Sequence, residues 1–188
     1  MRRLIALVAV TAVVAVGGYA YLQHSEPGWW VRIQYPLSYT AEIRGDSRIY
    51  HLDPALVAAV VYEESRFQPG TRSSAGAVGL MQLLPSTARG IAERTGGTHF
   101  HPATDLLNPD LNMRYGCWYL HHLMQRYHRV GLALAAYNAG EANVDAWLKQ
   151  TPRGQPVQIP FAATRSYVSD VEHVQKLYRK GYASQLGY

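Results

Sequence analysis

Two short motifs mark where helices begin in this sequence, and they direct the chain towards a helical fold. Asp53-Pro54 and Asn108-Pro109 each place a side chain that can cap free backbone amides before a proline, which fits the first helical position. Pro85 is expected to open a further helix that stops at Gly96-Gly97. No stretch alternates apolar and polar residues as a half-buried strand would. The sequence therefore predicts a mainly α protein.

The rest of the chain beyond residue 35 continues this helical pattern. Residues 56–61 are all apolar and lead into Tyr62-Glu63-Glu64-Ser65, and further helices are expected over residues 130–137, 141–149 and 162–182. Hydrophobic residues make up 48% of the chain and charged residues 16%, a balance that favours a folded core over disorder. We therefore expect one globular domain over residues 35–188.

The N-terminus has the character of an export signal. Arg2 and Arg3 precede an uncharged run of 19 residues, from residue 4 to residue 22. As a helix this run would span roughly 28 Å, which is close to the thickness of a bilayer core. We predict a transmembrane signal-anchor over residues 1–25 and a linker over residues 26–34. The arginines place the N-terminus in the cytoplasm and the domain outside it. We favour an uncleaved anchor; cleavage would make the protein secreted.

Charge and cysteine content exclude several other kinds of protein. The net charge of +5 suits an anionic surface, but no run of five basic residues occurs, so nucleic-acid binding is not expected. Cys117 is the only cysteine, which excludes an intrachain disulfide and is typical of a core residue. Neither the group His99, His101 and Asp105 nor the pair His121-His122 has a convincing metal-ligand pattern. We predict no metal and no cofactor.

Adjacent carboxylates at the end of the apolar segment 56–61 are the first candidates for chemistry. Glu64 shares one helix face with three valines, at positions 57, 60 and 61. A carboxyl group beside apolar residues has a raised pKa, which suits a general acid. Glu63 also lies beside apolar residues, because the helix is apolar nearly all round. Periodicity alone therefore leaves the choice between Glu63 and Glu64 open.

Four separated motifs together are more specific than any of them alone. Glu64-Ser65, residues 79–82 (Gly-Leu-Met-Gln), residues 136–140 (Ala-Tyr-Asn-Ala-Gly) and residues 164–168 (Thr-Arg-Ser-Tyr-Val) follow one another in this order. In this order they resemble the soluble-type lytic transglycosylase catalytic domain. The resemblance covers roughly residues 35–182.

This resemblance implies a mainly α, goose-type lysozyme-like single domain with a long groove for sugars. It also implies cleavage of the β-1,4 bond between N-acetylmuramic acid and N-acetylglucosamine without addition of water. In such enzymes a glutamate protonates the bridging oxygen. The resulting carboxylate then takes the proton of the muramoyl C6 hydroxyl, which closes a 1,6-anhydro ring. The implied partners are the glycan strands of peptidoglycan, besides the membrane at the N-terminal helix.

The resemblance also assigns residues. It makes Glu64 the catalytic residue and Tyr137 the hydrogen-bond partner of its carboxyl group. It places Ser73 near the substrate's acetamido group and Met81 at the groove floor. The residues implied to bind substrate are Ser65, Ser73, Met81, Gln82, Tyr137, Asn138 and Tyr167. One position departs from the family pattern: Ala163 stands where a glutamate usually precedes Thr-Arg.

Two other functions stay open at this point. The first is a lysozyme-like hydrolase that uses the same Glu64 with water as acceptor, and Asp105 is a candidate for positioning that water. The second is a noncatalytic wall-binding protein that retains the groove. The intact Glu64-Ser65 pair argues against the second function, whereas Ala163 favours it.

Overall fold

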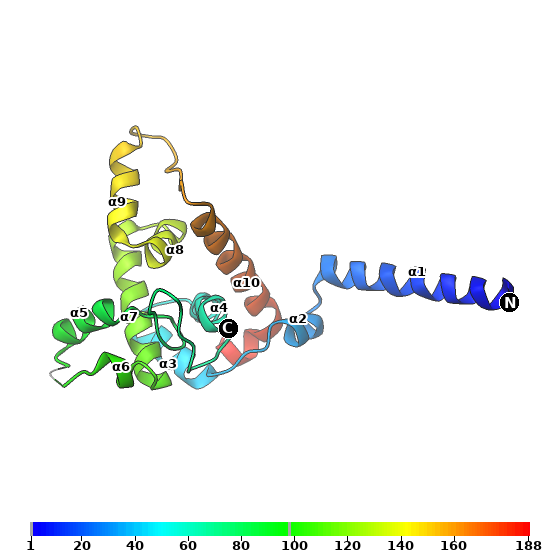
Figure 1. The fold of residues 1–188 in the computed structure, drawn as a ribbon, viewed down its shortest axis with the longest axis horizontal. Coiled ribbons are helices and arrows are strands. Elements are labelled where there is room, and N and C mark those ends of the chain that lie inside the picture. Colours follow the sequence, from blue (N-terminus) through cyan, green and yellow to red (C-terminus); the bar gives the residue numbers. More distant parts are fainter. Residues whose placement is uncertain (1, 98) are drawn as a thin grey trace.

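A computed structural model of the protein describes residues 2–97 and 99–188, with side chains from residue 9 onward. The described residues form ten α-helices and no β-strand (Figure 1), so the predicted mainly α fold is confirmed. In chain order the helices are α1 (Arg2–Ser25), α2 (Gly28–Gln34), α3 (Thr40–Ile49), α4 (Pro54–Ser65), α5 (Pro85–Thr95), α6 (Pro102–Asp105), α7 (Pro109–Tyr127), α8 (Val130–Ala139), α9 (Glu141–Gln150) and α10 (Ala162–Leu186).

Helix α4 forms the centre of the fold. It starts as predicted, because Asp53 Oδ1 accepts a hydrogen bond from the amide of Ala55 at 3.0 Å and Pro54 occupies the first position. Residues 56–61 are each at most 2% exposed. A helix that is apolar on every side is stable only when neighbours cover all of it. Helices α3 and α10 pack against α4 and contribute to that cover.

The long helix α10 crosses the domain and joins its parts. It packs against α2, α3, α4 and α8, while α7 packs against α3, α5 and α8 (Figure 1). Leu177 and Tyr178 of α10 are buried in the same apolar cluster as residues 56–61. This packing brings the start of α10 beside the end of α4, although about a hundred residues separate them along the chain.

A tight turn between α4 and α5 lies against α7. Val78 and Leu83 exchange backbone hydrogen bonds at 3.0 and 3.1 Å, which closes residues 79–82 into the turn. Two glycines permit the close approach to α7. A Cβ on Gly116 would lie 2.2 Å from Met81 Sδ, and a Cβ on Gly79 would lie 2.1 Å from Asn112 Nδ2. Gly79 also has a φ of +86°, which favours glycine.

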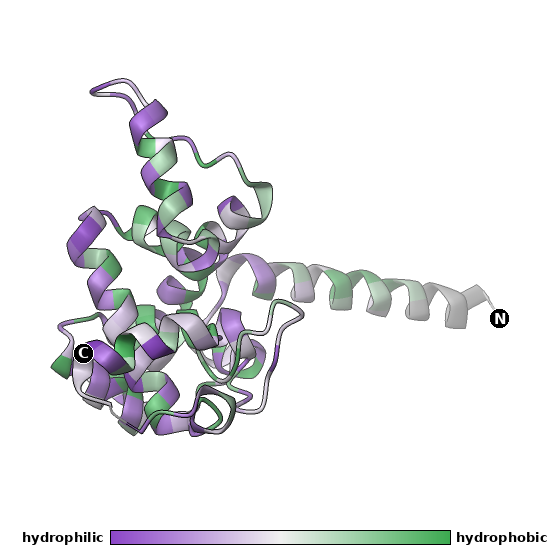
Figure 2. Ribbon diagram, turned by 60° about the vertical axis from the view of Figure 1, so that its left-hand side comes forward, coloured by the Kyte–Doolittle hydropathy of each residue, from purple (hydrophilic) through white to green (hydrophobic). Residues whose placement is uncertain are grey.

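The N-terminal helix α1 projects away from the domain, and hydrophobic residues run along its described part (Figures 1 and 2). Over the residues that the structure describes, no helix combines the length and apolarity needed to cross a membrane. The predicted span begins at residues 4–8, whose side chains lie outside the described part.

The segment predicted as a linker, residues 26–34, differs from that prediction because most of it forms α2. Val31 of α2 is 1% exposed and packs against Gly181 of α10. Arg32 Nε donates a hydrogen bond to the carbonyl of Gly181 at 2.7 Å. Gly181 lacks a Cβ, which would lie 2.8 Å from the Val31 side chain, so the two helices can touch. Sequence pattern misses this docking because only a seven-residue helix is involved.

Candidate active site

Glu64 lies in the last turn of α4, where the buried helix reaches a partly open position. The hydroxyl of Tyr167, from the first part of α10, donates a hydrogen bond to Glu64 Oε1 at 2.6 Å. Burial raises the pKa of Glu64 from its ordinary value of 4.5 to about 7, the Tyr167 bond lowers it, and the nearby Glu63 charge raises it. Near neutral pH the carboxyl group is therefore protonated in a large fraction of molecules.

Neighbouring Glu63 is in a different electrostatic situation. Its two carboxylate oxygens accept hydrogen bonds from the guanidinium of Arg66 at 3.1 and 3.3 Å. The Glu64 carboxyl group instead accepts a hydrogen bond from the neutral Tyr167 hydroxyl, and no cation pairs with it among the described residues. The structure thus separates two residues that periodicity leaves equivalent.

Three of the predicted motifs meet at the turn of residues 79–82. Ser65 Oγ donates a hydrogen bond to the carbonyl of Leu80 at 2.7 Å, and Tyr137 Oη donates to the carbonyl of Met81 at 2.8 Å. Burial raises the pKa of both Tyr137 and Tyr167 well above the ordinary value, so both hydroxyls remain donors. The predicted bond from Tyr137 to Glu64 is wrong: Tyr167 makes it, while Tyr137 holds the turn.

The side chain of Asn112, on α7, holds this turn through hydrogen bonds. The sequence analysis does not identify this residue. Its side chain is fully buried. Its Oδ1 accepts from the amide of Met81 at 2.8 Å, and its Nδ2 donates to the carbonyls of Val78 at 2.8 Å and Leu106 at 3.0 Å. The available signal was a polar residue directly between two apolar ones, Leu111 and Met113.

The other residues predicted to contact substrate differ in how exposed their side chains are. Ser65 and Met81 are 6% and 0% exposed, so their side chains lie in the interior beside the turn, and their contact with substrate stays a prediction. Ser73 is exposed, and its Oγ accepts from the amide of Ala77 at 3.0 Å. Gln82 Nε2 donates to the carbonyls of Thr71 and Gly79, which leaves its Oε1 without a partner in the described chain.

A pocket of about 180 Å³ lies beside the turn and includes Gln82, Tyr137 and Asn138 in its lining. Asn138 is exposed, and its Oδ1 accepts from the Thr164 hydroxyl at 2.9 Å, which ties α8 to the start of α10. Because the charge of Glu64 raises the pKa of Tyr137, this lining residue of the pocket lies near the Glu64 carboxyl group. These residues form a partly apolar hollow near a carboxyl group whose pKa is about 7.

The other candidates of the sequence lie elsewhere. Ala163 is exposed at the start of α10 and gives the site no carboxylate. Asp105 makes local bonds, since its carboxylate accepts from the amide of His101 at 2.8 Å and contacts the Thr104 hydroxyl. Within the described ranges, no group of three or more His, Cys, Asp or Glu residues is placed to hold a metal ion.

Sequence comparison adds a decisive observation to this geometry. The chain matches the profile of the transglycosylase SLT domain family over residues 42–158. The chain belongs to this family. The predicted resemblance to this family is therefore confirmed, together with the lysozyme-like domain that it implied.

Individual relatives of this SLT-domain chain agree with the family match. A soluble lytic murein transglycosylase of Salmonella typhimurium is 30% identical over 183 residues, covering 86% of this chain and 28% of the relative. One from Escherichia coli K12 is 31% identical over 153 residues, covering 78% and 24%. The lytic transglycosylase Slt of Pseudomonas aeruginosa, solved as an inactive mutant, has a TM-score of 0.73 at 32% identity, covering 83% and 26%. The chain thus spans about a quarter of the relatives' length.

The raised pKa of Glu64 predicts how the free energy of unfolding depends on pH. The folded state binds a proton that the unfolded state releases between pH 4.5 and about 7. The contribution of this group to stability is therefore present below pH 4.5 and is lost as the pH rises through 7. By about pH 8 the ionised, buried carboxylate opposes folding by up to roughly 3 kcal/mol. Glu64→Gln should accordingly be more stable than the parent at pH 8, with a smaller difference at pH 4.

Urea unfolding at the two pH values measures this difference. Glu63→Gln is the matched control, because it removes the ion pair with Arg66 and the smallest of the three effects on the Glu64 pKa, and it should change the free energy of unfolding by less than about 1 kcal/mol. A Glu64→Gln protein that is equally destabilised at both pH values would contradict the burial of an ionised group.

A second prediction concerns the support of the turn by Asn112. Asn112→Leu leaves one buried amide and two buried carbonyls without this partner, at a cost of ~1–3 kcal/mol for each unpaired group. We expect a large loss of unfolding free energy. We also expect a lower kcat with little change in KM at a temperature where the variant is folded.

Thr95→Val provides the comparison, since it removes a hydroxyl bonded to carbonyls within α5 and lies away from the turn. It should leave kcat unchanged. An unchanged kcat per folded molecule of Asn112→Leu would show that the turn needs no support from Asn112 for the reaction.

Proposed function

We propose that this SLT-domain chain is a peptidoglycan lytic transglycosylase that cleaves the β-1,4 bond between N-acetylmuramic acid and N-acetylglucosamine. The observation that carries the proposal is the environment of Glu64, a half-buried carboxyl group that accepts a hydrogen bond from Tyr167 and has a pKa of about 7. A general acid works best when its pKa lies near the working pH. No cofactor is needed for this chemistry.

The proposed reaction uses the same group twice. Protonated Glu64 first donates its proton to the bridging oxygen, and the bond from that oxygen to C1 of the muramoyl unit breaks. The carboxylate then accepts the proton of the C6 hydroxyl, whose oxygen bonds to C1 and closes the 1,6-anhydro ring. Tyr167 supports both steps, because its hydrogen bond stabilises the intermediate carboxylate and fixes its orientation.

Carboxylate placement favours this reaction over hydrolysis. Glycosidases that add water use a second carboxylate, roughly 5–10 Å from the acid, as nucleophile or water activator. Among the described residues, Glu63 is the acidic neighbour whose charge raises the pKa of Glu64, and its oxygens accept hydrogen bonds from Arg66. The C6 hydroxyl of the substrate would supply the nucleophile instead. Lysozyme-like hydrolysis stays the alternative, with a different product.

The relatives support the proposal by name. They are called soluble lytic murein transglycosylases, and the Pseudomonas aeruginosa enzyme was made inactive by changing one glutamate to glutamine. We further propose that Gln82, Tyr137 and Asn138 contact the sugars through the pocket beside the turn, and that Ser73 does so from its exposed loop.

Products and variants test the proposed reaction together. Muropeptides released from purified peptidoglycan should be lighter by one water than hydrolysis products and should end in 1,6-anhydromuramic acid, as measured by mass spectrometry. Glu64→Gln should lower turnover by roughly 10²–10⁴-fold while the protein stays folded, because the acid is lost.

The matched variant is Glu63→Gln, which should keep most of the activity. Reducing-end products would establish the hydrolase instead. If the protein binds peptidoglycan but releases no products, the assignment changes to a noncatalytic wall-binding protein. Ala163→Glu would then be the first variant to test for recovered activity. A loss in Glu63→Gln equal to that in Glu64→Gln would reopen the choice of acid.

From the N-terminal sequence, we propose that the domain lies outside the cytoplasm. The uncharged run of residues 4–22 after two arginines supports export, and membrane attachment through it stays a prediction. Cell fractionation followed by detection of the full chain tests the attachment. Recovery in the membrane fraction after a high-salt wash is expected, whereas release of the full-length chain into the soluble fraction would contradict an anchor.

A further inference from the structure

A second hollow, of about 400 Å³, lies away from Glu64 on the side of the domain formed by α7, α8 and α9. It is bounded by the end of α7, the start of α8, the end of α9 and the loop that follows α9. Its size falls in the range of pockets that hold small organic ligands. Three arginines line it, namely Arg126, Arg129 and Arg153, and no acidic residue does.

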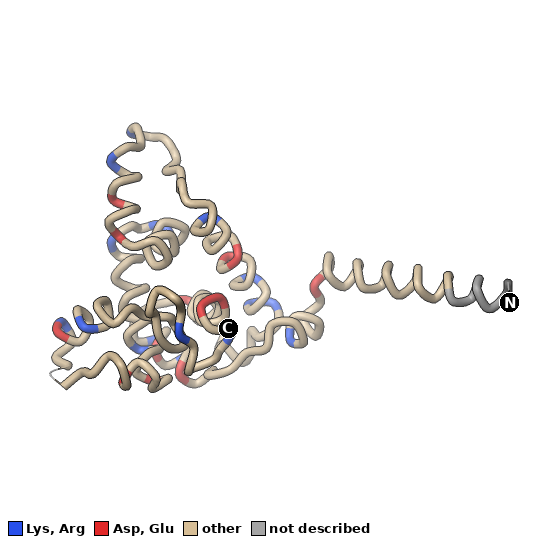
Figure 3. Tube along the Cα trace, in the orientation of Figure 1, with Lys and Arg blue, Asp and Glu red and all other residues tan. Residues whose placement is uncertain are grey.

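The three arginines differ in how their charge is compensated. Arg126 forms ion pairs with Asp145 at 2.7 Å and Glu141 at 3.3 Å. Arg129 and Arg153 are exposed and form no ion pair or hydrogen bond through their side chains with any part of the chain that the structure describes. Figure 3 shows basic positions both where α7 meets α8 and at the tip of the loop after α9. The hollow therefore carries two uncompensated guanidinium groups.

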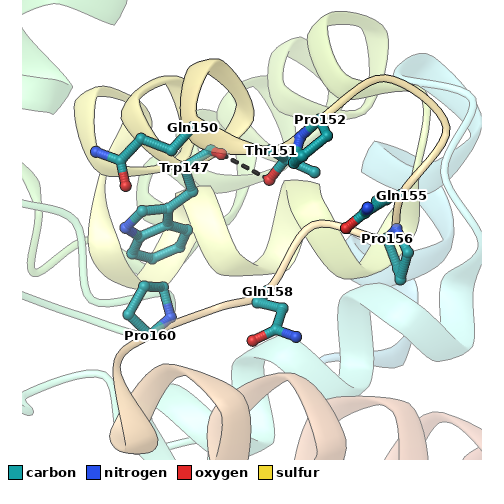
Figure 4. A pocket seen from close by; sticks show the side chains of 8 residues that line it. All are labelled: Trp147, Gln150, Thr151, Pro152, Gln155, Pro156, Gln158 and Pro160. Atoms are coloured by element: carbon teal, nitrogen blue, oxygen red, sulfur yellow. Dashed lines mark hydrogen bonds between the residues drawn. The ribbon is translucent and has the colours of Figure 1, made fainter.

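The loop presents Arg153 on a closed turn. The amide of Gln155 donates to the carbonyl of Pro152 at 3.1 Å, and Gly154 has a φ of +84°, as the third position of a type II turn requires. The Thr151 hydroxyl donates to the carbonyl of Trp147 at 2.8 Å and fixes the start of the loop (Figure 4). Arg153 thus has an ordered backbone before any ligand binds, which lowers the entropy lost on binding.

Apolar side chains form the other wall of the same hollow. Leu132, Leu148 and Val157 line it, and Leu148 is 38% exposed. The pocket of about 290 Å³ on the other side of the loop, drawn in Figure 4, is instead lined by prolines, glutamines, Thr151 and Trp147, and none of its described lining residues is charged. A hollow that combines free guanidinium groups with an apolar wall suits a carboxylate next to an apolar group, because arginine binds carboxylates through paired N–H donors.

We propose that this arginine hollow binds the free carboxylates of short peptides, specifically the peptide branches carried by the glycan strand. The identity of that peptide rests on the proposed function. Arg129 directly precedes α8, and Tyr137 of the catalytic site lies eight residues later, roughly 12 Å along the helix. An extended peptide of four residues spans at most roughly 14 Å. A branch on a sugar near Tyr137 is therefore long enough to reach the arginines.

A bare phosphate or an anionic phosphate polymer shares the charge of this ligand but not its apolar part. The exposed side chain of Leu148 would gain nothing from a phosphate, whereas a peptide side chain would cover its apolar surface. The structure therefore favours the peptide, and phosphate serves as the competitor in the test.

Direct binding to the full-length protein tests the hollow without reference to catalysis. The probe is the free peptide released from purified peptidoglycan by an amidase, titrated by calorimetry. Conversion of its carboxyl groups to amides should weaken binding at least tenfold, and so should the double variant Arg129→Ala/Arg153→Ala. Arg48→Ala, which removes an exposed arginine elsewhere, should bind as the parent does. Gly154→Val should weaken binding through the turn alone, because a Cβ there meets no neighbour.

Equal affinity for the acid and amide peptides would overturn the proposal, as would an unaffected double variant. Displacement of the peptide by an equal concentration of inorganic phosphate would also overturn it, in favour of a bare anion site. The thermal melting of each variant is recorded, so that misfolding is recognised; the exposed arginines should leave it unchanged.

Cleavage rates then connect the hollow to the reaction. The parent should cut peptide-bearing glycan at least fivefold faster than glycan stripped of its peptides. The double variant should lose this preference and keep the parent's rate on the stripped glycan. Equal parental rates on both polymers would refute the proposal, whereas failure to cut either polymer would refute the proposed function and leave the binding result to decide on the hollow.

Discussion

Burial of α4 on every side is the constraint on which both the fold and the candidate site depend. The helix can be apolar all round only because its neighbours enclose it, and that enclosure removes water from its last turn as well. Glu64 lies in that turn, so the burial that stabilises the core also raises the pKa of the acid. Stability and the proposed chemistry therefore oppose each other at this residue, because the burial that tunes the acid also penalises its ionised form.

The turn of residues 79–82 brings the residues of the candidate site together at the edge of this core. It joins the end of α4 through Ser65, α8 through Tyr137 and α7 through Asn112, and each of these bonds ends on a backbone group of the turn. Buried backbone groups need hydrogen-bond partners, and here side chains from three helices provide them. These bonds hold the three helices at fixed positions around the turn. The motifs are close together in space because they share this turn.

Much of the fold follows from local sequence, but the pairing within the site does not. Helix starts at Pro54, Pro85 and Pro109 are predictable because caps and prolines act over one or two residues. The choice between Glu63 and Glu64 is not, since a helix that is apolar all round has no preferred face. The contact of Arg66 with Glu63 and the approach of α10 to Glu64 distinguish the two carboxyl groups, and the second depends on tertiary packing.

The same reasoning explains why Tyr137 was the wrong partner for the acid and why Tyr167 is the right one. Tyr167 lies beyond residues 42–158, the region that matches the family profile, on a helix that folds back across α4. Its hydroxyl opposes the effect of burial on Glu64, since it stabilises the carboxylate that burial penalises. Burial alone would raise the pKa of Glu64 further. The carboxyl group would then hold its proton more tightly and transfer it less readily to the bridging oxygen in the proposed first step. An acid that must also act as a base requires both effects, and therefore requires α10 to be docked on α4.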